Sequence, residues 1–139
     1  MPDRLMERVY DRSYWRCMRS KVEGRDFFGT FYYELFELSP EIQGHFVGSD
    51  MRRQRRMLRD SFTLIGEHYF AENATALLRL RRLHEERSIR PHLYVQWLEA
   101  LLASVRKHDP EYDGETERAW RTVFEAGIDV MTQPSEVPE

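Results

Sequence analysis

Residues 77–91 read LLRLRRLHEERSIRP. Leu77, Leu80 and His84 are three and four residues apart, so a helix places them on one face. A histidine therefore ends an apolar stripe shortly before Pro91, where a helix must stop or restart. Neutral imidazole is the commonest metal ligand in proteins, which makes His84 a candidate ligand. The alternative is a core histidine bonded to a carbonyl group, and this stretch taken alone favours that alternative.

The composition indicates one soluble domain. The chain has 139 residues, 41% of them hydrophobic, and 18 aromatic side chains, which is enough to build a sizeable core. A single cysteine, Cys17, cannot form an internal disulfide, and its apolar helical neighbours predict a small core residue. No run of 18 apolar residues and no signal-peptide core occurs, so we expect a cytoplasmic protein without a membrane span.

Charge is distributed unevenly along the chain. Ten arginines lie between Arg52 and Arg90, and nine acidic residues lie between Asp109 and Glu139, although the formal net charge is only −3. A basic segment can meet phosphates or carboxylates. No nucleic-acid recognition motif accompanies it, so we expect a mostly solvated face and no nucleic-acid partner.

Hydrophobic periodicity predicts an all-α domain of six to eight helices, because no segment alternates with period two for long. Ser39 and Pro40 form a helix-start signal, and Asn73 is a further candidate cap. We assign residues 1–133 to the domain and expect a mobile tail at 134–139. The expected longer helices span about 3–22, 26–38, 51–70 and 73–84, with a short turn at 42–46; a helix after Pro91 stops at 108–110, and after a turn at 113–114 a last helix carries residues 120–131.

The stretch FYYELFELSPEIQGHF, residues 31–46, carries a recognisable pattern. Together with QRRML at 54–58, with Leu80, His84, Ile89, Pro91 and Tyr94 at their spacings, and with Trp120, it resembles bacterial globins. The nearest resemblance is to single-domain haemoglobins and to the globin domain of flavohaemoglobins, and it covers about residues 27–131. It implies a globin fold around a pocket for haem b, iron protoporphyrin IX.

The resemblance also implies roles for individual residues. His84 matches the proximal histidine that binds the iron, and Phe46 matches the phenylalanine that stacks on the haem. Tyr32 and Gln54 match the distal pair that faces a ligand on the iron. The remaining expected haem contacts are Leu58, Leu80, Ile89 and Tyr94.

The residue chemistry agrees with a haem pocket, although each residue has an ordinary alternative. A five-coordinate haem needs one imidazole and an open position opposite it, and glutamine is a poor iron ligand. A phenol and an amide in an apolar cage would stabilise a gas ligand that draws electron density. Tyr32 could instead be a core tyrosine that bonds a carbonyl group. Gln54 could place its amide in water at a helix start.

Other residues bear on the resemblance. His45, His68, His92 and His108 match no ligand position, so we expect surface or cap residues, with His45 next to the pocket. Arginines 52, 53, 55, 56 and 59 should mostly form a solvated face, and one or two of them, or Arg87, could pair with haem propionates.

Two departures from flavohaemoglobins stand out. The segment between Phe46 and Gln54 is about two residues shorter than theirs. Glu125 and Asp129 fall off the inner stripe of the last helix, so neither matches the glutamate that supports the proximal histidine there.

The resemblance predicts a protein that binds dioxygen, nitric oxide and carbon monoxide. With electrons from a separate flavin reductase, it could convert nitric oxide to nitrate, because no flavin- or nicotinamide-binding domain is present in the sequence. Three alternatives stay open: an oxygen carrier for transport or storage, a gas-sensing module, and a haem-free scaffold. We expect a monomer or a homodimer.

Overall fold

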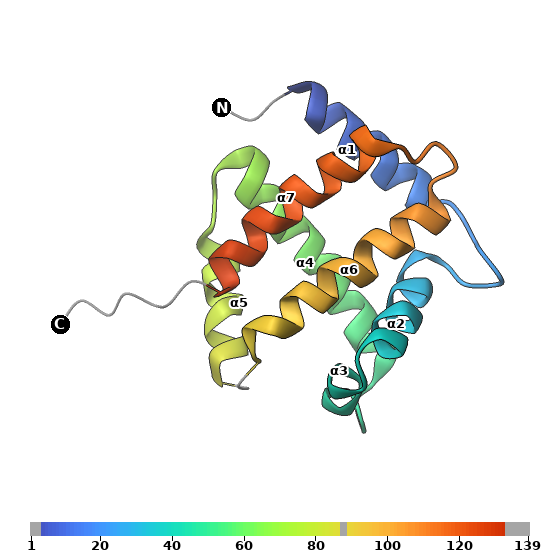
Figure 1. Ribbon diagram of the computed structural model, residues 1–139. Helices are drawn as coiled ribbons and strands as arrows, with labels where there is room; N and C mark the ends of the chain where they lie inside the picture. The colour runs from blue at the N-terminus through green and yellow to red at the C-terminus, as the bar shows by residue number, and fades with distance from the viewer. Residues whose placement is uncertain (1–3, 87–88, 133–139) are drawn as a thin grey trace.

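A computed structural model describes residues 4–86 and 89–132 of the chain (Figure 1). These residues form seven α-helices and, apart from one isolated bridge between Val22 and Arg25, no β structure. The all-α prediction is therefore confirmed for this part of the chain, and the expected tail at 134–139 lies outside it. The helices are α1 (Arg4–Met18), α2 (Phe27–Leu38), α3 (Pro40–His45), α4 (Met51–Ala71), α5 (Thr75–Glu86), α6 (Pro91–His108) and α7 (Gly114–Thr132).

The helices pack across one another. In Figure 1, α6 and α7 run in front of α4, with α5 at one end of the assembly and α2 and α3 at the other. The principal packing pairs are α2 with α6 and α4 with α7, and α1 covers the ends of α6 and α7. No helix in the described residues is long and apolar enough to cross a membrane.

Side-chain caps fix the starts of α2, α3 and α4 close to where the sequence predicted them. Asp26 accepts a hydrogen bond from the Gly29 amide at α2, and Ser39 accepts one from the Ile42 amide at α3. Asp50 caps α4 through the Arg52 and Arg53 amides. Each cap satisfies an amide that has no partner inside its helix.

The first helix is shorter than predicted. It ends at Met18 rather than near Val22. Glu23 and Gly24 both have positive φ, and Val22 and Arg25 pair through their backbones. This tight turn uses the backbone groups that a longer helix would need.

The core consists mainly of aromatic side chains. Trp120, Phe27, Phe31 and Phe124 are each at most 1% exposed. Cys17 is fully buried, which confirms the prediction that it is a core residue. Burial of this apolar area is the main stabilising contribution to the fold.

Helix α7 approaches α4 closely at Gly127. A β-carbon built there would lie 3.0 Å from the Cγ1 atom of Ile65. Glycine thus sets the separation of two helices that both line the cavity described below.

The prediction that His108 is a surface or cap residue is wrong. It is 1% exposed, and its Nδ1 and Nε2 atoms each lie 2.6 Å from a hydroxyl oxygen, those of Ser20 and Thr30 respectively. Through these bonds, the end of α6 packs against α2 and the segment after α1. Burial lowers its pKa, so the ring is neutral at pH 7.

A second buried polar group lies next to His108. Asp109 accepts hydrogen bonds from Ser13 at 2.6 Å and from Nε of Arg16 at 2.5 Å. Ser13 in turn accepts from the indole N–H of Trp120 at 2.8 Å. These bonds tie α1 to the α6–α7 connection, and they satisfy side chains that would otherwise be costly to bury.

Candidate functional site

A cavity of about 310 Å³ lies between two sets of helices. One wall comes from α2, α3 and α4, and the other comes from α5, α6 and α7. Its walls are predominantly apolar and include Leu35, Ile42, Leu77 and Trp97. Such a cavity, with a few polar groups directed into it, is the usual form of a small-molecule or cofactor site.

The structure brings together all eight residues that the sequence singled out, because every one of them lines this cavity. Their individual roles toward a cofactor stay predictions. The eight are Tyr32, Phe46, Gln54, Leu58, Leu80, His84, Ile89 and Tyr94.

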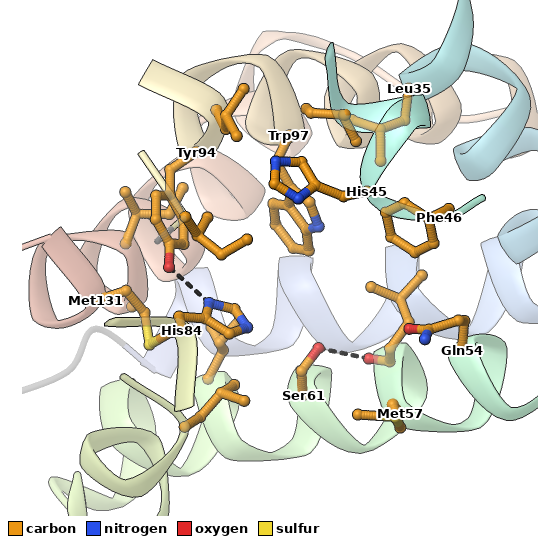
Figure 2. A pocket seen from close by; sticks show the side chains of 18 of the residues that line it. Leu35, His45, Phe46, Gln54, Met57, Ser61, His84, Tyr94, Trp97 and Met131 are labelled. Atoms are coloured by element: carbon orange, nitrogen blue, oxygen red, sulfur yellow. Dashed lines mark hydrogen bonds between the residues drawn. The ribbon is translucent and has the colours of Figure 1, made fainter. Parts of the chain in front are cut away.

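His84 occupies one side of the cavity. It follows Leu77 and Leu80 on the inward face of α5, as the spacing predicted. Its Nδ1 atom lies 2.6 Å from the hydroxyl oxygen of Tyr94, on α6 (Figure 2). Burial raises the pKa of Tyr94 to about 12, with Glu85 adding to the shift, so this hydroxyl is protonated at neutral pH. The ring orientation of His84 is thus fixed by a neighbouring helix.

Gln54 and Phe46 lie across the cavity from His84 (Figure 2). Gln54 is in the first turn of α4 and is half-buried, so its side chain is not simply in water. Phe46 follows α3 and packs against Tyr32, with 5.6 Å between ring centroids. The polar group and the aromatic ring therefore share the wall opposite the imidazole.

Tyr32 lines the cavity next to Phe46 and is 8% exposed. Its hydroxyl donates to the backbone carbonyl oxygen of Gln54 at 3.1 Å. The tyrosine therefore fits both readings of the sequence, since it lines the cavity and also bonds a carbonyl group. Burial raises its pKa to about 12, so it remains a hydrogen-bond donor at neutral pH.

The cavity also contains residues to which the sequence analysis gave no site role. His45 is exposed as expected, but its side chain lines the cavity. Trp97 lies one helical turn after Tyr94, and Met131 lies one turn after Ile128, so their positions followed from helical spacing. Ser61 also lines the cavity, and its hydroxyl donates to the Leu58 carbonyl at 2.6 Å.

The arginines of α4 do not line the cavity. Arg55 instead pairs with Asp26, the cap of α2. Pairing of an α4 arginine with a haem propionate stays a prediction. Arg87 lies outside the described residues. Glu125 and Asp129 are exposed, which agrees with their position off the inner stripe.

The donor set limits which metal site can exist here. Among residues 4–86 and 89–132, no three histidine, cysteine, aspartate or glutamate side chains are grouped as metal ligands. One imidazole alone binds a metal weakly, so a metal at His84 must bring its remaining ligands with it. A metal held in the plane of a flat, apolar macrocycle meets this requirement and fits the apolar walls. The residues present thus fit a haem.

Comparison with known proteins gives two findings. The globin family model matches residues 29–131 of this chain. A crystal structure of a protein from Pseudomonas aeruginosa PAO1, described as structurally highly homologous to a human haemoglobin, superimposes with a TM-score of 0.84. The two sequences are 34% identical, and the match covers 91% of this chain and 95% of the other. No curated protein sequence matches this chain.

Proposed function

The chain belongs to the globin family, and from this premise we propose that it binds haem b in the cavity, with His84 as the iron ligand. The observation that carries the proposal is the hydrogen bond of 2.6 Å between His84 and Tyr94, on the opposite side of the cavity from Gln54. A scaffold that acts by protein contacts alone has no use for an imidazole held in this way.

The role of His84 as an iron ligand depends on which of its ring nitrogens carries the proton. An imidazole that binds iron through Nε2 carries its proton on Nδ1, so Nδ1–H donates to the Tyr94 oxygen. This bond engages Nδ1, which suits Nε2 as the metal-binding atom, and it restricts rotation of the ring. Leu80 and Ile89 line the cavity on this side and would contact the macrocycle.

Bound haem would supply an open coordination position for dioxygen, nitric oxide or carbon monoxide. The Gln54 amide and the Tyr32 hydroxyl are two hydrogen-bond donors that this chain offers in the cavity. Leu58 and Phe46 would exclude water, which strengthens any hydrogen bond to the gas ligand. To reach such a ligand, the Tyr32 hydroxyl would turn from the Gln54 carbonyl, a bond of 3.1 Å.

The reaction we propose is the dioxygenation of nitric oxide. One dioxygen, one nitric oxide and one electron give nitrate, and a flavin reductase would supply the electron. The pocket would exclude water, orient the two gases and hold one of them by hydrogen bonds. An oxygen carrier would use the same pocket without the electron supply.

Absorption spectra of the purified protein test haem binding. We expect a strong band at roughly 400–430 nm that shifts when carbon monoxide is added to the reduced protein. His84→Ala should lose this spectrum or change it strongly. His92→Ala is the matched control, because that histidine is exposed and bonds only Glu41 among the described residues. A colourless protein after hemin is supplied, or an unchanged spectrum in His84→Ala, would contradict the proposal.

The yield of nitrate separates the two functions. Reduced, oxygenated protein is mixed with nitric oxide under continuous reduction by a flavin reductase. Repeated turnover to nitrate supports dioxygenation. A single turnover followed by accumulation of the ferric form would indicate a carrier.

A further inference from the structure

The first half of α4 has an unusual charge. Residues 51–59 contain five arginines and no acid, in a chain whose formal net charge is −3. The first turn of a helix favours acidic side chains, because its amide groups give it a partial positive charge. Here the first turn has no acid, and Arg52 and Arg53 occupy it. This arrangement costs stability, and such local conflicts often mark functional surfaces.

Four of these arginines, all except Arg55, have no acidic partner within the described residues. Arg53 and Arg56 are exposed, and neither lies within 4.0 Å of a carboxylate oxygen there. Arg59 lies over the ring of Phe28, with 5.3 Å from its guanidinium carbon to the ring centroid. Arg55 is different, because it pairs with Asp26. The outer arginines therefore remain available to an external anion.

The arginines are adjacent to the proposed haem site. Arg53, Arg56 and Arg59, with Met57 and Asp60, line a shallow recess on the outside of α4. Met57 also lines the main cavity, and it is 39% exposed. Met57 thus borders both the basic recess and the cavity. A protein docked on the recess would lie against the wall of the haem pocket.

We propose that Arg52, Arg53, Arg56 and Arg59, here called the arginine face, dock an acidic flavoprotein that reduces the haem iron. This inference rests on the proposed function. One electron leaves the reduced flavin, and the iron changes from ferric to ferrous, with no bond made or broken. The arginine face would attract carboxylates on the donor and hold its flavin near Met57.

An anionic membrane or nucleic acid is a less suitable partner. Beyond residues 51–59, acidic side chains outnumber basic ones, because the whole chain is negative despite the five arginines. An extended polyanion would also approach the acidic side chains outside residues 51–59, and these would repel it. A protein with a limited acidic patch can cover the arginine face alone.

Reduction kinetics with reduced flavodoxin, a small acidic flavoprotein, test the proposal. The test variant is Arg53→Glu/Arg56→Glu in the haem-loaded protein. The control is Arg8→Glu/Arg12→Glu, which makes the same change in net charge at exposed arginines of α1. We expect the test variant to be reduced about tenfold more slowly at low salt, and the control to be close to wild type. The difference should disappear at roughly 0.5 M salt.

Two further measurements separate loss of docking from damage to the haem pocket. A small neutral reductant should reduce all three proteins at the same rate, and their absorption spectra should be identical. Direct titration of flavodoxin should show weaker binding only for Arg53→Glu/Arg56→Glu, and this readout needs no haem. It therefore decides the docking site even if the protein proves to bind no haem.

Several results would overturn the proposal. Equal rates and equal affinities for the two variants would remove the arginine face from docking. An equal loss in both variants would reflect net charge rather than a site. Binding to anionic phospholipid vesicles or to duplex DNA, without binding to flavodoxin, would assign the arginine face to a different partner.

Discussion

The Nδ1 atom of His84 lies 2.6 Å from the hydroxyl oxygen of Tyr94, and this bond joins α5 to α6 at the edge of the cavity. The two residues are ten positions apart, on either side of Pro91. The bond fixes the imidazole in one orientation before any cofactor is present.

Tyr94→Phe should therefore weaken haem binding without abolishing it. Loss of an outer hydrogen bond to a metal-binding histidine costs about tenfold to a hundredfold in affinity. The measurement is the rate of haem transfer to an excess of apomyoglobin. Tyr112→Phe is the control, since that hydroxyl bonds Glu117, away from the cavity. Equal rates in the wild type and Tyr94→Phe would show that the bond does not support haem binding.

Tyr32→Phe should speed dissociation of dioxygen from the reduced protein. Loss of one hydrogen bond of about 1–1.5 kcal/mol corresponds to roughly a tenfold faster off-rate. Stopped-flow mixing of the oxygenated protein with carbon monoxide measures this rate. Tyr33→Phe is a matched control on the same helix, because Tyr33 is exposed and lies outside the cavity. An unchanged off-rate in Tyr32→Phe would remove Tyr32 from the distal role.

Gly127→Ala should destabilise the fold. The added β-carbon would lie 3.0 Å and 3.2 Å from the two γ-carbons of Ile65, so α4 and α7 would have to separate or Ile65 would have to move. Overpacking of this kind costs about 1–3 kcal/mol.

Gly66→Ala should have the opposite effect. It lies within α4 with nothing within 4 Å of the added carbon, and it should gain up to about 1 kcal/mol from helix propensity. Denaturant unfolding of both variants gives the free energies of unfolding. Destabilisation by Gly66→Ala, or none by Gly127→Ala, would contradict the packing described.

Stability should fall as the pH drops below about 6.5, partly because of His108. Burial lowers the folded-state pKa of this histidine, so the unfolded chain takes up its proton first as the pH falls. The contribution of His108 to the free energy of unfolding therefore decreases as the pH falls from its pKa in the unfolded chain to its lower pKa in the folded protein.

The test compares wild type with His108→Gln by denaturant unfolding at pH 7.5 and at pH 5. The variant should be less stable at pH 7.5, because the hydrogen bonds to Ser20 and Thr30 are altered, and the difference should shrink at pH 5. A difference that is the same at both pH values would exclude His108 as a source of pH dependence.

Local sequence patterns determined most of the fold. The three- and four-residue spacing of Leu77, Leu80 and His84 placed them on one helix face, and that face lines the cavity. Capping residues such as Ser39 set helix starts, because a side-chain oxygen within three residues satisfies a free amide. These are short-range effects, and a linear sequence displays them directly.

The resemblance to globins predicted which residues from different helices line one site, which periodicity could not predict. Helical spacing does not show that Tyr32 and Gln54 meet His84 around one cavity, because they are on different helices. The motif order carried that information, and in the structure all three residues line one cavity.

Only the tertiary structure decided how the distant polar groups are paired. Ser13 meets Asp109 across 96 positions, and His108 meets Ser20 across 88. His108 ends a helix beside charged residues, which resembles a surface cap in sequence, yet packing against α2 buries it. Periodicity along one helix determines which side chains share a face. The packing of the helices determines which residues those side chains contact.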